Sequence, residues 1–98
     1  MNAHRTELPV WAHGDKSKAF ATAMVAYLCL GVSWSAAFSL AQAAYWYPND
    51  VIAASDDDLL SLRGIGPARL KKIRDIFDAG VHPHDPDVKT IYERAKDV

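Results

Sequence analysis

The residues best suited to chemistry lie between positions 62 and 74, where two glycines are followed by a cluster of basic side chains. Gly64 and Gly66 flank Ile65, so the backbone can turn tightly there and approach another molecule closely. Pro67 stands where a first helical residue would lie. Main-chain N–H groups at such a turn, beside cationic side chains, can bind a phosphate. The candidate anion-binding residues are Arg63, Gly64, Ile65, Gly66, Arg69, Lys71, Lys72 and Arg74.

Two helices are predicted to position this turn. Ser55 is a suitable N-cap, and Asp56 to Asp58 would lie at the positive end of the first helix dipole. Gly80 is expected to close the second helix. Apolar residues recur at helical spacing on both sides of the turn. They are Leu59, Leu60 and Leu62 before it and Leu70, Ile73, Ile76 and Phe77 after it.

The segment from Val51 to Phe77 resembles the helix-hairpin-helix motif, whose core is a hydrophobic residue, a spacer and Gly-hydrophobic-Gly. The resemblance implies contact with the DNA backbone and no reading of base sequence. Carried over by position, the phosphate-binding amides would be those of Gly64, Gly66 and Arg69. Some members of the family also hold a monovalent cation on hairpin carbonyls. Here those carbonyls would belong to Leu60, Leu62 and Ile65.

Composition indicates one small folded domain. The chain has 98 residues, half of them hydrophobic, and a net charge of −1. Cys29 is the single cysteine, which excludes an internal disulfide and most thiolate metal sites, so we expect it to be a buried hydrophobe. The polar segment from Met1 to Trp11 does not resemble a signal peptide, and we expect a cytoplasmic protein.

Four segments follow along the chain. Residues 1–14 are predicted to form an arm, held down by Leu8, Val10 and Trp11. Residues 15–50 form an apolar helical hairpin, with one helix from a cap at Asp15 or Ser17 to about Leu30. Residues 51–80 are the segment that resembles the helix-hairpin-helix, and residues 81–98 are predicted to form a connector and a last helix. That helix would begin at Asp85 or Asp87 and bury Val88, Ile91, Tyr92 and Ala95.

The second helix of the apolar hairpin is predicted from Trp34 to about Tyr47, with Ser33 as its N-cap and Pro48 after its end. Its packing face would be formed by Trp34, Ala37, Phe38, Ala41, Ala44 and Tyr45, and its polar face by Ser35, Ser39 and Gln42. No strand pattern appears. The fold class predicted is therefore all-α, with about five helices.

A possible internal repeat links the two halves, because 33 positions separate Gly31-Val32-Ser33 from Gly64-Ile65-Gly66. This arrangement resembles the paired helix-hairpin-helix domain of DNA repair nuclease subunits, in which two hairpins joined by a linker helix straddle the duplex. The first copy departs from the pattern: Ser33 replaces a glycine, Trp34 replaces the proline, and no basic residue lies nearby in sequence. Two interpretations stay open: the first copy is a degenerate half that supplies core and symmetry, or the two glycine turns coincide by chance.

Three other interpretations of the chain are weaker. Residues 19–49 carry no charge and are long enough to span a bilayer, but Ser, Thr and Gln interrupt them, so we expect no membrane span. The turn near Gly31 also resembles that of a helix-turn-helix, yet the next helix lacks Arg, Lys or Asn to read bases. His82, His84 and Asp85 are a weak metal pattern, and we expect solvated loop residues and no metal there.

We expect no enzyme and no small-molecule substrate. Asp56 to Asp58 are consecutive carboxylates at a helix start, which are usually dipole partners and not a catalytic cluster. No Ser/His/Asp set, Cys/His pair or P-loop is present. The only cofactor expected is the monovalent cation of the hairpin.

The function predicted is sequence-independent DNA binding. Four phosphate contacts would give a log–log salt slope of about −3.6 on duplex DNA. One hairpin binds weakly, so we expect a homo-oligomer or a protein partner, contacted through the apolar helices of residues 19–47. The alternative is a protein-interaction or adaptor module, for example a phage or host-factor binding protein, that uses the same helices.

Overall fold

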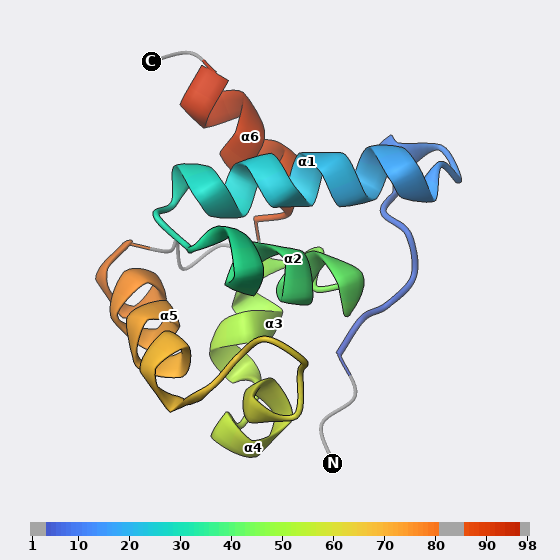
Figure 1. Ribbon diagram of the computed structural model, residues 1–98. Helices are drawn as coiled ribbons and strands as arrows, with labels where there is room; N and C mark the ends of the chain where they lie inside the picture. Colours follow the sequence, from blue (N-terminus) through green and yellow to red (C-terminus); the bar gives the residue numbers. More distant parts are fainter. Residues whose placement is uncertain (1–3, 81–85, 97–98) are drawn as a thin grey trace.

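The computed structural model describes residues 4–80 and 86–96, and the side chains of residues 4–77 and 86–96. Its elements are a 3₁₀ turn, η1 (Val10–Ala12), and the helices α1 (Lys16–Cys29), α2 (Trp34–Gln42), α3 (Pro48–Ala53), α4 (Asp56–Leu60), α5 (Pro67–Gly80) and α6 (Val88–Lys96) (Figure 1). The described residues contain no strand. The all-α class is therefore confirmed, and the described residues form six α-helices in place of about five.

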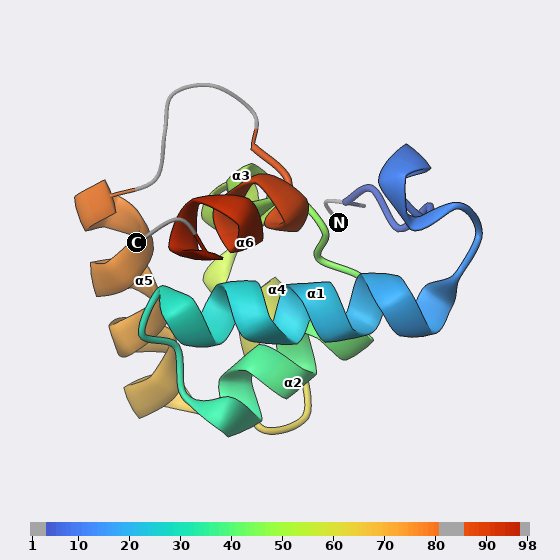
Figure 2. The ribbon, with the colours of Figure 1, turned by 90° about the horizontal axis from the view of Figure 1, so that it is seen from above.

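The helices pack in two groups around one core. Helix α1 lies against α2 on one side and α6 on the other, while α5 packs against α3 and α4 (Figures 1 and 2). The largest fully buried side chains come from different segments and include Tyr27, Leu40, Trp46, Leu59 and Ile73. The hairpin of α4 and α5 is thus attached to the α1–α2 hairpin by shared apolar packing.

Side-chain caps begin the helices where the sequence predicts them. Asp15 accepts a hydrogen bond from the Lys18 N–H at 3.1 Å, and Ser55 accepts one from the Asp58 N–H at 3.1 Å. Ser33 accepts from the Ala36 N–H at 3.4 Å. Each capping oxygen pairs with an N–H that has no intrahelical partner.

The helix predicted from Trp34 to Tyr47 is wrong at its end, because α2 stops at Gln42. Ala44 has a φ of +63°, and the Tyr45 N–H donates to the Leu40 carbonyl at 3.0 Å. This is the hydrogen bond of a Schellman cap. It turns Tyr45 and Trp46 into the core, where their exposed fractions are 3% and 1%. Pro48 then begins α3 and does not end a helix.

Burial differs from the prediction at several apolar positions. Cys29 is exposed and is not the buried hydrophobe expected. Trp34 is 62% exposed although it was placed on the packing face, whereas Ser39 from the polar face is 6% exposed. Val10 is 91% exposed and does not hold the arm.

The N-terminal arm is held by its polar residues together with Leu8 and Trp11, which pack on the core. The His4 ring stacks on Tyr45 with 3.7 Å between ring centroids. Arg5 donates to the Asp50 carboxylate at 2.9 Å. The first contact joins the arm to the segment between α2 and α3, and the second joins it to the first turn of α3.

Candidate nucleic-acid interface

The hairpin between α4 and α5 turns at Gly64, whose φ is +95°. A Cβ atom at this position would lie 2.7 Å from the Ser39 Oγ. The Ser39 hydroxyl donates to the Arg63 carbonyl from behind the turn. Gly64 is therefore required twice, by its left-handed backbone and by the close approach of α2.

Ile65 and Gly66 have different roles in the same turn. Ile65 points into the core with 4% of its surface exposed, and its N–H donates to the Leu62 carbonyl at 3.2 Å. Gly66 does not have a positive φ, and a Cβ atom there would meet nothing within 4 Å. The fold therefore tolerates a side chain at Gly66.

The three main-chain N–H groups predicted to bind phosphate are open. Those of Gly64, Gly66 and Arg69 have no acceptor among the residues that the structure describes, and all three residues are at least partly exposed. Helix α5 begins here, since the Leu70 N–H donates to the Gly66 carbonyl at 2.9 Å. The bend thus presents the unpaired donors of a helix start to solvent.

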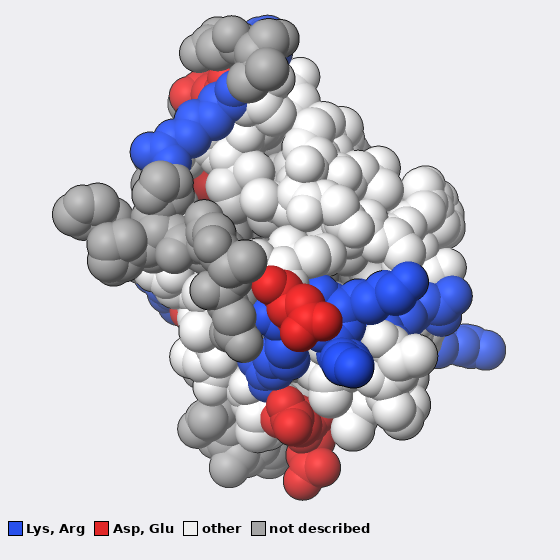
Figure 3. Space-filling model, turned by 90° about the vertical axis from the view of Figure 1, so that its left-hand side faces the viewer, with Lys and Arg blue, Asp and Glu red and all other residues white. Residues whose placement is uncertain are grey.

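Basic side chains surround these donors. Arg69 Nη1 donates to the Gly64 carbonyl at 2.9 Å, which holds a guanidinium beside the hairpin. Arg63, Lys71 and Lys72 are also exposed. Figure 3 shows blue side chains gathered on the α5 side of the molecule, with acidic side chains among them. The charge on this surface is therefore mixed, with a local basic excess at the hairpin.

Arg74 does not belong to the open basic surface, contrary to the prediction. Its guanidinium donates to the Ala54 carbonyl at 2.7 Å, to the Val51 carbonyl at 3.1 Å and to the Asp56 carboxylate at 2.9 Å. These carbonyls end α3, so Arg74 acts as a C-terminal cap that joins α5 to α3 and α4. Four basic residues remain for an anion.

The carbonyls predicted to hold a monovalent cation are not equally available. The Leu62 carbonyl accepts the Ile65 N–H, whereas those of Leu60 and Ile65 receive no hydrogen bond within the described ranges. The cation stays a prediction. The histidine pair His82 and His84, with Asp85, lies outside the described residues.

The first turn, Gly31-Val32-Ser33, shares two features with the second. Gly31 also has a φ of +95°, and Val32 is buried with 3% of its surface exposed. Position 36 is related to position 69 by the 33-residue offset. Ser33 Oγ accepts the N–H of Ala36, whereas Gly66 has no side chain to accept that of Arg69.

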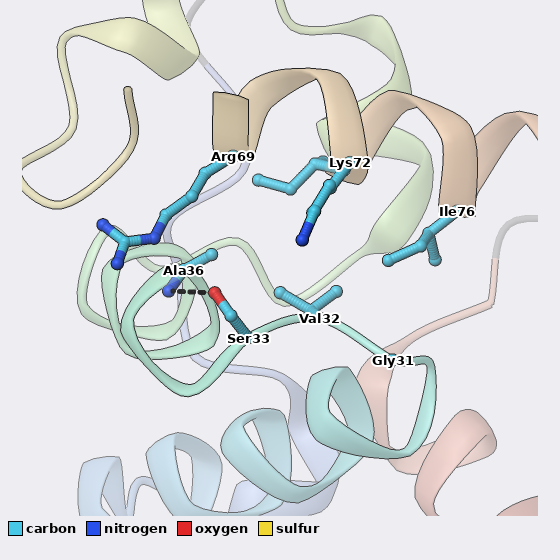
Figure 4. A pocket seen from close by; sticks show the side chains of 8 residues that line it. Gly31, Val32, Ser33, Ala36, Arg69, Lys72 and Ile76 are labelled. Atoms are coloured by element: carbon cyan, nitrogen blue, oxygen red, sulfur yellow. Dashed lines mark hydrogen bonds between the residues drawn. The ribbon is translucent and has the colours of Figure 1, made fainter. Parts of the chain in front are cut away.

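The fold also brings basic residues to the first turn, which has none nearby in sequence. A cleft of about 100 Å³ separates this turn from α5 (Figure 4). Arg69 and Lys72 line it on the α5 side, and Val32 and Ser33 line it on the opposite side. Sequence reasoning missed this pairing, because only the packing of α5 against the α1–α2 hairpin creates it.

No family model, no curated protein and no solved structure matches this chain. In the described part of the chain, no helix is both long enough and apolar enough to cross a bilayer.

Proposed function

We propose that the protein binds the phosphate backbone of DNA without reading its sequence, through the helix-hairpin-helix of residues 51–80. The supporting observation is the exposed bend, whose N–H groups at Gly64, Gly66 and Arg69 have no described acceptor. Main-chain N–H groups at a helix start, next to a guanidinium, are well suited to phosphate oxygens. Contacts of this kind fix position on the duplex and carry no base information.

Four side chains supply the long-range attraction: Arg63, Arg69, Lys71 and Lys72. Four neutralised phosphates correspond to a log–log salt slope of about −3.6 on duplex DNA and about −2.8 on single strands. Such a surface binds weakly alone. Useful affinity therefore requires several copies or a partner protein, so that further contacts become intramolecular.

The test is the Gly66→Asp variant, measured by the fluorescence anisotropy of a labelled duplex at low salt. The fold has room for this side chain, and Asp is a favourable N-cap, so the variant should unfold at the wild-type urea concentration. Its carboxylate would occupy the phosphate position, and we expect affinity to fall at least about tenfold, or 1.4 kcal/mol.

The matched control is Ser17→Asp, which adds the same charge to the first turn of α1, away from the hairpin. It should change affinity by less than about twofold, because exposed charges beyond a Debye length are screened. Equal losses in the two variants, or no binding by the wild type at low salt, would refute the proposal.

A second function, a protein-interaction module, is favoured by one surface feature. Trp34 is 62% exposed and stacks on Phe38 with 5.4 Å between ring centroids, and Phe20 meets Phe38 edge to face. Exposed aromatic side chains are typical of interface centres. If the wild type binds no DNA yet self-associates, and Trp34→Lys abolishes the association in sedimentation experiments, this second function replaces the first.

A further inference from the structure

The cleft between the first turn and α5 has the composition of an anion site. Its floor is apolar and includes Val32, Ala36 and Ile76. Two cationic side chains of α5, Arg69 and Lys72, lie along its other wall (Figure 4). In that view the Lys72 side chain extends toward the first turn, and the Arg69 guanidinium lies to the side of Ala36 away from Lys72.

Neither cation is neutralised by a carboxylate. Lys72 has no hydrogen-bond or ion-pair partner among the described side chains, and Arg69 uses one of its five N–H donors on the Gly64 carbonyl. Ser33 lines the opposite wall, and its oxygen accepts the Ala36 N–H, so its hydroxyl hydrogen is free to donate. Three donor side chains, two from α5 and one from the first turn, therefore border one small space.

The size of the cleft limits the ligand. At roughly 30 Å³ for each water in the liquid, about 100 Å³ holds roughly three water molecules. This volume suits a tetrahedral oxyanion and lies far below the roughly 300 to 1,000 Å³ of pockets for drug-sized molecules. A phosphate group fits, and a nucleoside does not.

We propose that this cleft is a second phosphate site, in which Lys72, Arg69 and the Ser33 hydroxyl hold one phosphate of the nucleic-acid backbone. The inference rests on the proposed DNA binding, and it extends the contact surface from the hairpin to the first turn. Arg69 connects the two sites, because it contacts the Gly64 carbonyl and lines the cleft. The first turn, which lacks basic residues of its own, thereby acquires them from α5.

The experiment uses the ¹⁵N-labelled full chain, titrated with inorganic phosphate against sodium chloride at equal ionic strength. We expect amide shifts at Val32, Ser33 and Ala36 that saturate with phosphate and not with chloride. Lys72→Gln should weaken this binding about fivefold, the upper value for one exposed ion pair. Lys18→Gln is the matched control, since Lys18 is exposed in the first turn of α1 and does not line the cleft. It should leave the phosphate affinity within about twofold of wild type.

A second titration with a short duplex separates the two proposals. Shifts at Val32 and Ser33 on duplex binding, reduced by Lys72→Gln, support the cleft as a backbone site. If the duplex binds and shifts only the amide signals of the hairpin, the cleft proposal is wrong and the proposed function stands. If phosphate binds in the cleft but no duplex binds, the proposed function fails and the cleft is a site for free phosphate only. If Lys18→Gln and Lys72→Gln weaken phosphate binding equally, the cleft proposal is also wrong.

Discussion

The two glycine turns share a left-handed glycine but differ in hydrogen bonding at two equivalent N–H groups. Gly31 and Gly64 share a φ of +95°, and the next residue is buried in both turns. In the first turn, the Gly31 N–H donates to the Leu28 carbonyl at 3.0 Å and the Ala36 N–H is taken by Ser33. The equivalent N–H groups in the second turn find no acceptor in the described structure.

The comparison shows how a structural corner differs from an anion site. The left-handed glycine and the buried residue after it are common to both turns, so they do not by themselves indicate binding. What differs is whether the protein already uses the N–H groups, and a single side chain, Ser33 in place of Gly66, decides this at the helix start. The free donors of the second turn are therefore the feature to test.

The largest effect is expected from Gly64→Ala, which tests whether the second turn depends on its packing against α2. The left-handed φ costs about 1 to 2 kcal/mol with a side chain, and overlap with Ser39 adds about 1 to 3 kcal/mol. Gly31→Ala should cost only about 1 to 2 kcal/mol, because its Cβ would lie 3.9 Å from the nearest atom, on Ile76. Urea unfolding followed by circular dichroism measures both.

A double variant separates the two costs at Gly64. Ser39→Ala removes the oxygen that a Cβ at this position would meet, so combining it with Gly64→Ala should recover the overlap term and leave the φ term. If Gly64→Ala and Gly31→Ala destabilise equally, and Ser39→Ala rescues neither, the two turns are supported in the same way and the contrast in packing is wrong.

Tyr27 provides the next largest effect, since it ties the first turn to the core. Its carbonyl accepts the Val32 N–H at 3.0 Å, and its buried hydroxyl donates to the Tyr45 carbonyl. Tyr27→Phe leaves that carbonyl without its donor and should cost about 1 to 3 kcal/mol in urea unfolding. DNA affinity should not change, because the second turn is untouched; a loss of affinity in the folded variant would contradict this division of roles.

The same residue makes stability depend on pH. Burial, with a smaller contribution from Asp50, raises the pKa of Tyr27 far above its usual value, so the phenol stays neutral in the folded chain. The unfolded chain loses this proton above about pH 10, and stability should then fall by up to about 1.4 kcal/mol per pH unit for this group. Burial also raises the pKa of Tyr45, so Tyr27→Phe should reduce the slope and not abolish it.

Exchanging the capping residues tests the comparison most directly. Gly66→Ser gives the second turn the residue of the first, and its hydroxyl should accept the Arg69 N–H as Ser33 accepts that of Ala36. Stability should rise by a few tenths of a kcal/mol, while DNA affinity should fall about fivefold, the equivalent of one ordinary hydrogen bond. DNA affinity measured by anisotropy should therefore fall while stability measured by urea unfolding rises. Unchanged affinity would show that the Arg69 N–H does not bind phosphate.

Much of the fold could be predicted from the sequence, because its signals are local. Ser33, Ser55 and Asp87 are short polar residues before apolar periodic segments, and each accepts an N–H of the helix it precedes. The turn at Gly64 was likewise visible as a glycine that the backbone requires. Such features depend on neighbours within four residues.

The parts that were missed depend on contacts between distant segments. Arg74 has the sequence context of a phosphate-binding residue, but packing places it on carbonyls 20 or more positions away. Lys72 is 39 positions from Ser33 in the chain, yet both line one cleft. No pattern along a single helix encodes which carbonyl or turn will lie opposite a given cation.

The smallest effect comes from a third turn, at Ala44, which extends the comparison to a residue that suits its backbone poorly. Ala44 has a φ of +63°. Its N–H donates to the Ala41 carbonyl, and the Tyr45 N–H donates to the Leu40 carbonyl, so α2 ends in the same kind of cap that Gly31 makes after α1. Ala44→Gly removes the left-handed penalty, offset in part by the greater freedom of glycine in the unfolded chain, and should stabilise by about 0.5 to 1 kcal/mol. Ala43→Gly is the matched control. Because Ala43 has a φ of −82°, this substitution should lower stability by about 0.5 to 1 kcal/mol. The two alanines are adjacent and both partly buried, so they lose similar packing. If Ala44→Gly raises the free energy of unfolding and Ala43→Gly lowers it, the difference comes from the backbone. If both substitutions lower it, lost packing outweighs the backbone effect.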